Sequence, residues 1–388
     1  MIKNGSTEFG KNMYILFVTM SYPRTKYLTS GIFEFDQAKA LIKEGIKVVY
    51  LSLDLRSIRK WRKFGIDRIK KNGINIYSFN FPLGNFSSSI YNFISSIGFY
   101  YSYKKILKNE GKPDILHAHF FKPAYIAAKY VKKINIPLII TEHSSLINTT
   151  EINKTYHKMA LFAYNKAQKV ISVSEALSKN IETNFNIKSM VIPNIFNSNI
   201  FKYASKIKSN HFQIVSTGNL IYSKRMDLTI SAFVKAFQDN NNVKLIIFGD
   251  GPERIKLQQM IHDLNAEKKI ELKGICIREE IASYLNESDL FVLASQTETF
   301  GVSYIEALAM GVPVIATKCG GPEGFIDNQN GILVDIDNFD QLVDSFHYMY
   351  ENIGKYDREL ISNRSNKLFS EHTVAKKLIE LYNQVLNA

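Results

Sequence analysis

The stretch ETFGVSYIEALAMGVPVIATKCGG, residues 298–321, joins an apolar segment with helical spacing to a short β-rich run that ends in two glycines. A helix that leads directly into a buried strand is the unit from which parallel sheets are built. Two glutamates, Glu298 and Glu306, stand within this unit, and a carboxylate beside such a core costs stability unless it is paired or solvated. Glu306 could face water on the helix surface, or both carboxylates could reach into a ligand site.

The same alternation of strands and helices extends in both directions along the chain. It indicates parallel βαβ units in doubly wound sheets, interrupted by a Pro-Asn turn region at residues 191–201. We therefore expect an α/β fold of two similar Rossmann-like domains that face a central cleft. The expected strands are 13–20, 46–53, 74–81, 114–120, 137–144, 169–177, 212–220, 243–251, 269–275, 289–295, 312–318 and 331–336, and the expected helices include 32–45, 225–238, 253–266 and much of 340–386.

The predicted domain boundaries follow from the turn region. Residues 13–195 form the N-terminal domain, and residues 196–369 form the C-terminal domain. The last helix, 370–388, could return to the N-terminal domain. A chain of 388 residues is also too long for one ordinary core, which agrees with two or three domains.

Composition indicates a globular protein of a reducing compartment. Hydrophobic residues make up 45% of the chain and charged residues 22%, and the two cysteines have no metal-ligand spacing. The polar opening, residues 1–12, lacks the layout of a signal peptide and is interpreted as a leader, a tag remnant or an upstream start. No uninterrupted apolar run is long enough for a transmembrane helix, so we expect none. The two cysteines fit a reducing cytosol, and we expect a cytoplasmic protein.

The charge is unevenly distributed. Residues 1–200 hold 29 Lys and Arg against 12 Asp and Glu, whereas residues 201–388 hold 20 against 24. A basic half could face nucleic acid, an anionic membrane or a phosphorylated acceptor. Because the chain has no nucleic-acid-binding motif, we expect no nucleic-acid partner.

A basic segment, residues 54–73, suggests how the basic half could meet a membrane. Read as a helix, it places Ile58, Trp61 and Phe64 near one side with cations around them, as in helices that lie on membrane surfaces. The aromatic stretch 89–105 could add an apolar face. A helix that packs on the core with a solvated basic side explains the pattern nearly as well. We expect peripheral attachment to the inner face of the cell membrane.

Polar and glycine-rich elements gather where the expected strands end. In open parallel sheets, ligands bind beyond the carboxyl ends of the strands. Lys224 and Arg225 precede a helix whose N-terminus favours phosphate, although a solvated surface pair is the more common reason for such a pair. No P-loop and no strict GxGxxG motif is present. The elements in question are Ser30-Gly31, His119, Glu142-His143, Gly218-Asn219, Gly249-Asp250-Gly251, Glu298 and Gly320-Gly321.

Three histidines lie near these ends in the first half. His143 follows an expected strand, where a hydrogen-bonded structural histidine is somewhat more common than a ligand-binding one. His117 and His119 flank Ala118 on a strand, so both side chains should point to the same face. A two-histidine metal site would need further ligands, and no nearby carboxylate or cysteine spacing supplies them.

Together these residues carry a resemblance to a known family. The chain resembles the retaining GT-B glycosyltransferases of family 4, also called glycosyl transferase group 1, from about residue 14 to 385. The most specific match is a glutamate followed by Phe-Gly, with a second glutamate eight positions after the first and then GVPVIA. The motifs that carry the likeness are GIFEFDQAKALIKEGIKVVYL, DILHAHF, TEH, VISVSEAL, VIPN, TGNL with KR and D, IIFGDGPE, LKG, SQTETFGVSYIEALAMGVPVIATKCGG and NGILV.

The resemblance implies a donor site mainly on the C-terminal domain. Glu298 would hold hydroxyls of the donor sugar, Glu306 the ribose hydroxyls, and Lys224 would neutralise the diphosphate as it leaves. His143 matches the family histidine that faces the donor sugar, and the backbone near Gly274-Ile275 would meet the base. Residues 13–195 would then be the acceptor-side domain and residues 196–369 the nucleotide-sugar-binding domain. The implied catalytic residues are His143, Glu298 and Lys224; the implied nucleotide-sugar-binding residues are Gly31, Gly218, Asn219, Lys224, Arg225, Gly274, Ile275, Glu298, Phe300, Gly301, Val302 and Glu306; and His119 is placed on the acceptor side.

The activity implied is retaining transfer of a sugar, with UDP as the default nucleotide. The acceptor would be a hydroxyl of a glycan or a lipid-linked molecule in the synthesis of surface polysaccharide, lipopolysaccharide or glycolipid. No cofactor and no metal is expected. A nucleotide-sugar epimerase of the same architecture is the alternative. The chain departs from the family in having Asn219 where arginine is common, so that Arg225 could compensate, and in having Ser30 where the first loop usually has a second glycine.

Overall fold

The computed structural model describes residues 13–25, 30–57, 62–83, 87–205 and 210–388. The chain divides into two compact units. Unit 1 comprises Met1–Val173, Leu177–Asn194 and Glu371–Ala388, and unit 2 comprises Ser174–Ala176 and Ile195–Ser370. The main break therefore lies one residue from the boundary expected from the sequence. The interpretation of residues 1–12 falls outside the described residues.

Unit 1 is built on an eight-stranded sheet with the order β3-β4-β2-β1-β5-β6-β7-β8. Its described neighbours pair in parallel, except that β3 is antiparallel to β4. β1 and β6 are buried along their whole length, as strands covered on both faces must be. The strands are β1 (Tyr14–Thr19), β2 (Lys47–Asp54), β3 (Gly65–Lys71), β4 (Ile74–Asn80), β5 (Ile115–His119), β6 (Leu138–Glu142), β7 (Lys169–Ser172) and β8 (Met190–Val191).

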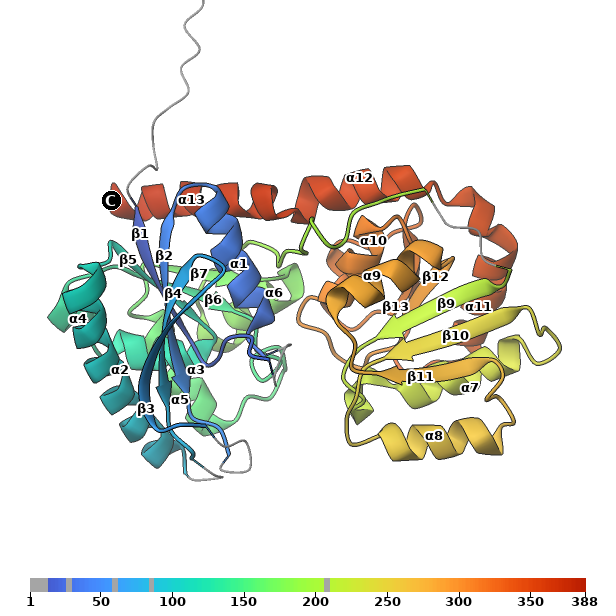
Figure 1. The fold of residues 1–388 in the computed structure, drawn as a ribbon, viewed down its shortest axis with the longest axis horizontal. Coiled ribbons are helices and arrows are strands. Elements are labelled where there is room, and N and C mark those ends of the chain that lie inside the picture. Colours follow the sequence, from blue (N-terminus) through green and yellow to red (C-terminus); the bar gives the residue numbers. More distant parts are fainter. Residues whose placement is uncertain (1–12, 26–29, 58–61, 84–86, 206–209) are drawn as a thin grey trace, which may run out of the picture. The chain divides into compact units, whose positions relative to one another are not determined.

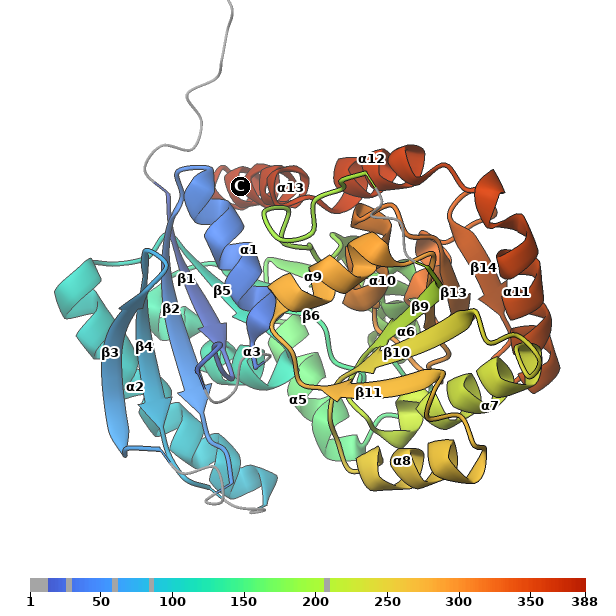
Figure 2. The same cartoon turned by 45° about the vertical axis from the view of Figure 1, so that its right-hand side comes forward.

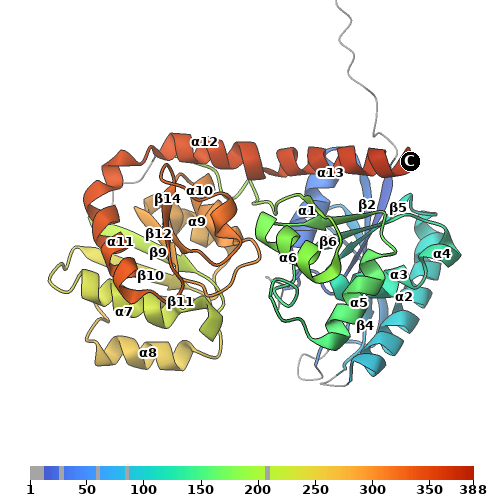
Figure 3. The same ribbon diagram turned by 180° about the vertical axis from the view of Figure 1, so that it is seen from behind.

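Helices cover both faces of this sheet (Figures 1 and 3). α1 (Ile32–Lys43) and α13 (Glu371–Leu386) lie side by side on one face, where Nδ1 of His372 is 2.6 Å from Oε1 of Glu44. α2 (Ser88–Glu110), α3 (Phe121–Ala128) and α5 (Lys154–Tyr164) cover the other face. The last helix of the chain thus belongs to the first unit. The remaining helices are α4 (Val131–Ile134) and α6 (Glu175–Phe185).

Unit 2 has a six-stranded, fully parallel sheet with the order β11-β10-β9-β12-β13-β14 (Figure 2). This is the strand order of a dinucleotide-binding fold, and its direction reverses between β9 and β12, at the position where such sheets bind ligands. The strands are β9 (Phe212–Thr217), β10 (Val243–Phe248), β11 (Ile270–Gly274), β12 (Leu290–Leu293), β13 (Val314–Thr317) and β14 (Gly331–Val334).

The helices of unit 2 form a layer on each face of its sheet (Figure 1). α7 (Met226–Ala236), α8 (Arg254–Asp263) and α11 (Phe339–Asn352) lie on one face, and α9 (Arg278–Glu287), α10 (Val302–Ala309) and α12 (Arg358–Phe369) lie on the other. Short 3₁₀ turns, η2 (Tyr222–Lys224), η3 (Pro322–Gly324) and η4 (Ile353–Lys355), link some of these elements.

The helix expected in the basic segment 54–73 is wrong for its second half. Gly65–Lys71 is the edge strand β3, which returns through Asn72-Gly73 to pair with β4. Both turn residues have positive φ, 48° and 82°, as a tight two-residue hairpin requires. Phe64 packs edge-on against Phe81, with ring centroids 4.9 Å apart. Ile58 and Trp61, the other members of the expected apolar side, lie outside the described residues. Among the described residues, no helix is long and apolar enough to cross a membrane.

Candidate functional site

A lysine and a glutamate meet at the strand-order reversal of unit 2. Lys224 lies in η2 after β9, and Glu298 lies after β12, the neighbouring strand. Nζ of Lys224 donates to Oε1 of Glu298 at 2.5 Å, and the hydroxyl of Ser295 donates to the same oxygen at 2.9 Å. The side chains of Lys224 and Glu298 are 20% and 11% exposed, so the pair is largely shielded and still reachable from solvent. Two predicted catalytic residues are therefore in direct contact.

The backbone holds Glu298 firmly at this position. Its amide donates to the carbonyl of Cys319 at 3.2 Å, and its carbonyl accepts from the amide of Gly321 at 2.9 Å. Glu298 and Gly320 form a parallel bridge beyond the end of β13. A Cβ on Gly321 would lie 2.5 Å from Cα of Phe300, so this close approach requires glycine. The double glycine thus allows the loop after β13 to lie against the loop that carries Glu298.

The residues after Glu298 present backbone rather than side chains. Phe300 is buried against Phe325 and Phe369, with ring centroids 5.2 and 5.7 Å away. Gly301 has φ 92°, and a Cβ there would lie 2.4 Å from the ring of Tyr304. α10 begins at Val302, so the first amides of the helix lie beside the Lys224–Glu298 pair in sequence and carry the partial positive charge of a helix N-terminus. This backbone suits a phosphate.

Glu306 has a partner that the sequence interpretation missed. Nε and Nη2 of Arg278, the first residue of α9, contact Oε1 of Glu306 at 3.2 and 2.5 Å. The side chains of Arg278 and Glu306 are 19% and 13% exposed, respectively. Glu306 is therefore a largely buried carboxylate held by a guanidinium, and not a surface residue that faces water. The only sequence signal for Arg278 was a cation just after the predicted base-contacting residues Gly274 and Ile275.

Arg225 is engaged with acidic neighbours. Its guanidinium contacts Asp227 at 3.1 and 3.3 Å and also pairs with Asp337. The hypothesis that Arg225 compensates for Asn219 must therefore allow for two carboxylates that already balance its charge. Asn219 itself is exposed. Gly218 matters through its backbone, because a Cβ on the facing Gly249 would come within 1.8 Å of its carbonyl oxygen.

The predicted base-contacting residues lie at the end of β11. Gly274 has φ 80°, a conformation that favours glycine, and Ile275 is 68% exposed. An exposed apolar side chain that follows a strand end can lie against a flat base. Gly218, Lys224, Gly274, Ile275 and Glu298 thus all follow carboxyl ends of strands in one sheet.

Unit 1 brings the three histidines together. The rings of His117 and His119 stack with centroids 4.4 Å apart, which confirms that both point to the same face, and those of His119 and His143 stack at 5.4 Å. Nδ1 of His119 is 3.1 Å from Nε2 of His143. Nδ1 of His117 is 2.6 Å from the hydroxyl of Tyr382 in α13. The C-terminal helix α13 is therefore hydrogen-bonded to His117, the first of the three stacked histidines.

Burial makes these imidazoles neutral. It lowers the pKa of His117 and of His143 to about 3, and it lowers the pKa of His119 well below its usual value. His119 is fully buried, its Nδ1 contacts His143, and its Nε2 has no hydrogen-bond partner among the described residues, so its placement on the acceptor side stays a prediction.

Glu142 fixes the turn that carries His143. One oxygen of its carboxylate accepts from the amides of His143 and Ser144 at 3.0 and 2.8 Å, and the other accepts from the hydroxyl of Tyr164 at 2.8 Å. Burial raises the pKa of Glu142 to about 7, against the lowering effect of these donors. The sequence marked Glu142 as a polar strand end but assigned it no role.

Gly31 forms the N-cap of α1 in the left-handed conformation, with φ 69°. A Cβ there would lie 2.4 Å from the carbonyl oxygen of Ser21, so the first loop packs back on itself. Ser30, which replaces the second glycine of the family, bonds across the loop to the hydroxyl of Ser21 at 3.1 Å. Serine at position 30, in place of the usual glycine, therefore adds a side-chain hydrogen bond that closes the loop.

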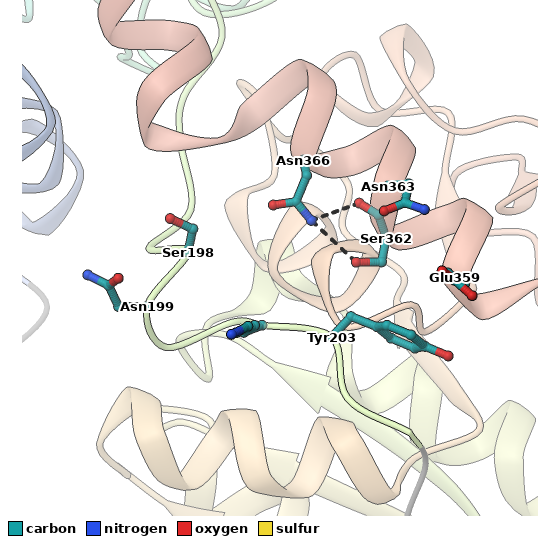
Figure 4. Close-up of a pocket in the computed structure, with 8 residues that line it drawn as sticks. Ser198, Asn199, Tyr203, Glu359, Ser362, Asn363 and Asn366 are labelled. Carbon is teal, nitrogen blue, oxygen red and sulfur yellow. Dashed lines mark hydrogen bonds between the residues drawn. The ribbon is translucent and has the colours of Figure 1, made fainter. Parts of the chain in front are cut away.

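A separate pocket of about 550 Å³ lies in unit 2 (Figure 4). Its walls are mainly polar, and the amide of Asn366 donates to the carbonyl and the hydroxyl of Ser362 at 3.0 and 3.3 Å. It contains none of the predicted site residues. The lining residues are Ser198, Asn199, Lys202, Tyr203, Glu359, Ser362, Asn363 and Asn366.

Two family models match adjacent parts of the chain. Residues 35–199 match the model of glycosyltransferase family 4, and residues 197–367 match that of glycosyl transferases group 1. The chain is 30% identical over 253 residues to an uncharacterised glycosyltransferase of Methanocaldococcus jannaschii, covering 64% of this chain and 68% of that protein. It is 24% identical over 290 residues to a phosphatidylinositol N-acetylglucosaminyltransferase component of Arabidopsis thaliana, covering 73% of this chain but only 64% of the plant protein.

Solved structures share the fold over nearly the whole chain. Sucrose-phosphate synthase from Thermosynechococcus elongatus superposes with a TM-score of 0.80 at 17% identity, covering 97% of this chain and 99% of that one. The Anabaena protein HepE in complex with UDP gives 0.74 at 20% identity, covering 96% and 100%. The predicted α/β architecture with Rossmann-like parallel sheets is confirmed.

Proposed function

Because the chain belongs to the GT-B glycosyltransferases of family 4, the glycosyl transferases group 1, we propose that it transfers a sugar from UDP to a hydroxyl group with retention at the anomeric carbon. Its acceptor would be a glycan or a lipid-linked molecule in the synthesis of surface polysaccharide, lipopolysaccharide or glycolipid. Both matched models describe glycosyltransferases, which favours transfer over the epimerase alternative.

The Lys224–Glu298 contact at the strand-order reversal is the observation that carries this proposal. A cation beside a carboxylate offers both things that a nucleotide-sugar needs, a partner for the diphosphate and an acceptor for sugar hydroxyls. In the proposed complex, the diphosphate draws Lys224 toward itself while Glu298 turns to the sugar. The backbone from Phe300 to Val302 approaches the phosphates, and Glu306 binds the ribose. UDP is chosen because HepE, which has the same fold, was solved with UDP.

The proposed reaction is a front-face displacement. The acceptor hydroxyl attacks the anomeric carbon on the side from which the diphosphate leaves, and a phosphate oxygen takes the hydroxyl proton. Lys224 stabilises the negative charge that grows on the leaving diphosphate. His143 is only partly buried, but desolvation lowers its pKa to about 3, so the neutral ring can exchange a hydrogen bond with a sugar hydroxyl without adding charge. We propose that these steps require no metal ion and no other cofactor.

We further propose that α2 attaches the protein to an anionic membrane surface. Ile90, Phe93, Ile97 and Tyr101 are exposed and recur at helical spacing on one side of α2. Exposed lysines, Lys104, Lys105 and Lys108, follow in its last turns. Apolar side chains next to cations match a bilayer with anionic head groups. The plant relative is named for transfer to phosphatidylinositol, which supports a lipid-linked acceptor. We propose that the protein is cytoplasmic and attaches to the inner face of the membrane.

A two-step assay tests the transferase. Thermal unfolding is measured with UDP, GDP and ADP and their sugars, since a bound ligand raises the midpoint according to its affinity. The stabilising donor is then incubated with the protein and an acceptor mixture. The expected result is release of the nucleoside diphosphate only when an acceptor is present. Interconversion of the donor sugar without an acceptor would favour the epimerase and overturn the proposal.

A further inference from the structure

Three arginines surround one buried aspartate in unit 1. Asp54, the last residue of β2, has no exposed surface. Nε and Nη2 of Arg56 contact its two oxygens at 2.6 and 2.5 Å, and Arg62 pairs with Oδ1. Nη2 of Arg24, from the loop after β1, lies 3.5 Å from Oδ2. The guanidiniums are themselves sheltered, with side-chain exposures of 19%, 18% and 7% for Arg24, Arg56 and Arg62.

Neutral side chains hold the first of these arginines in place. Nη2 of Arg24 donates to the hydroxyl of Ser78 at 2.9 Å and to the side-chain oxygen of Asn80 at 2.7 Å. Its guanidinium also stacks 4.4 Å from the ring centre of Tyr22. Nε of Arg24 is buried and has no hydrogen-bond partner among the described residues. The amide of Asn80 in turn donates to Asp67 at 2.7 Å.

The cluster has more positive than negative charge. Arg24, Arg56 and Arg62 bring three positive charges, whereas Asp54 and the more distant Asp67 bring two negative ones. Burial lowers the pKa of Arg62 against the opposing effect of Asp54, and the neighbouring charges of Arg56 and Arg24 lower it further. Like charges held together out of water repel one another strongly unless a further anion balances them.

The cluster lies at the edge of the sheet where ligands bind. Arg24 follows β1, Asp54 ends β2, and Ser78 and Asn80 end β4, so all stand at the carboxyl ends of neighbouring parallel strands. The strand order of unit 1 reverses between β1 and β5. The histidines belong to β5 and β6 on one side of that reversal, and the arginines to β1 and β2 on the other.

We propose that this arginine cluster binds a phosphate group of the acceptor. Guanidiniums present paired donors that match phosphate oxygens, and Asp54 fixes the direction in which they point. The inference rests on the proposed function, because it names the chemical class of the acceptor that the transferase would use. The phosphate could belong to a lipid head group or to a soluble phosphorylated sugar, and both present the same dianionic or monoanionic group to the cluster.

A purely structural ion cluster is the competing explanation for Asp54 and its partners. One arginine with two contacts would suffice to neutralise Asp54, and Arg56 already makes both. The additional guanidinium of Arg24 stays 3.5 Å from the carboxylate and takes its short contacts from neutral oxygens. The charge of Arg24 is therefore only partly balanced at the carboxyl edge of the sheet. A cluster that served only to neutralise Asp54 would not need this additional arginine.

Binding of sn-glycerol 3-phosphate to the full chain tests the proposal, with and without saturating UDP. We compare wild type with Arg24→Gln, Arg24→Lys and the control Arg68→Gln; Arg68 lies on the edge strand β3 and pairs with Glu110 at 2.9 Å. Isothermal titration should give one site in wild type and in the control. Arg24→Gln should weaken the binding of sn-glycerol 3-phosphate at least tenfold. Arg24→Lys should weaken it less, because lysine keeps the charge but loses the paired donors.

The outcomes separate this proposal from the donor site. Loss of glycerol phosphate binding in Arg24→Gln with unchanged UDP affinity supports the cluster as an acceptor-phosphate site. Equal affinity in Arg24→Gln and Arg68→Gln, or no binding to wild type, overturns it even if UDP binds well. Failure of UDP to bind would refute the donor assignment and leave the comparison of the Arg24 and Arg68 variants readable. If Arg24→Gln does not fold, the affinity of Arg24→Lys for sn-glycerol 3-phosphate is compared with that of Arg68→Gln, and equal affinities overturn the proposal.

Vesicle sedimentation then identifies the source of the phosphate. Vesicles of phosphatidylcholine alone are compared with vesicles that contain phosphatidic acid, for wild type, Arg24→Gln and Arg68→Gln. Competition of sn-glycerol 3-phosphate with phosphatidic acid vesicles indicates a lipid head group that enters the cluster. Binding of the soluble probe alone indicates a soluble phosphorylated acceptor. Either result supports the cluster. Vesicle binding that neither Arg24→Gln nor sn-glycerol 3-phosphate changes is attachment through another surface such as α2, and if the soluble probe does not bind either, the cluster is overturned.

Discussion

Replacing Arg278 by alanine should weaken UDP binding although Arg278 is not expected to touch the nucleotide. The guanidinium contacts Oε1 of Glu306 through two nitrogens, at 3.2 and 2.5 Å, and so holds the carboxylate proposed to bind the ribose. The guanidinium thus fixes the direction in which the carboxylate of Glu306 points. Without Arg278 the carboxylate of Glu306 is no longer held in one direction, but it also no longer shares its oxygens with a guanidinium. We expect the first effect to be larger, so that UDP binds more weakly.

The magnitude follows from side-chain entropy. A glutamate that loses its anchor regains rotamer freedom worth up to about 1.5–2 kcal/mol, which the ligand must then remove. That amounts to roughly tenfold weaker UDP binding for Arg278→Ala. Glu306→Ala removes two hydrogen bonds to a charged group, each worth about 1.5–3 kcal/mol, so its loss should exceed about a hundredfold. In the Glu306→Ala background, Arg278→Ala should add almost nothing.

Isothermal titration of UDP into wild type, both single variants and the double variant measures this cycle. Arg364→Ala on α12 is the control, because Arg364 is not a predicted site residue and its loss also removes a guanidinium–carboxylate pair, the contact with Asp327 at 2.5 Å. Equal losses from Arg278→Ala in the wild-type and Glu306→Ala backgrounds would show that Arg278 acts independently of Glu306. Wild-type affinity in Glu306→Ala would refute the ribose assignment itself.

Three further predictions concern the chemistry, the stability and the membrane surface. Glu298→Ala should abolish transfer while UDP affinity changes only a few-fold, as steady-state rates and titration would show; a parallel loss of both would contradict its role at the sugar. Burial raises the pKa of Glu34 to about 7 from 4.5, so the folded state holds this proton longer, and Glu34 alone lowers the stability of wild type by about 3 kcal/mol as pH rises from 4 to 9. Glu34→Gln should escape that loss in urea unfolding at the two pH values, and an equal pH dependence in both proteins would refute this. Phe93→Ser should reduce sedimentation with anionic vesicles, whereas Phe162→Ser on α5 should not, and equal behaviour would exclude α2 as the attachment face.

The sequence was sufficient to predict most strands and the sheet edge that carries the site. Strand ends rich in glycine and polar residues are local signals, so Gly218 and Glu298 could be placed beyond carboxyl ends from the sequence alone. Periodicity failed at β3, because the cations and apolar residues of 65–71 also fit a helical pattern. The Asn72-Gly73 dipeptide was the missed signal, since it is typical of a tight hairpin.

Partners distant in sequence could not be predicted, because nothing local encodes them. Arg278 and Glu306 are 28 positions apart, Lys224 and Glu298 are 74 apart, and His117 and Tyr382 are 265 apart. Each of these contacts depends on where the strand order and the last helix bring separate segments together. The family resemblance supplied roles for Lys224 and Glu298, but it supplied none for Arg278 or Tyr382.

The two sides of the reversal in unit 1 suit different parts of one substrate. On the β5 side, burial keeps His143 neutral, so it can share a hydrogen bond with a hydroxyl without attracting an anion. On the β1 side, Arg24 and its neighbours keep a positive charge that attracts one. A substrate with a reactive hydroxyl at one end and a phosphate at the other would satisfy both. It follows that changes at His143 should act mainly on turnover, and changes at Arg24 mainly on acceptor affinity.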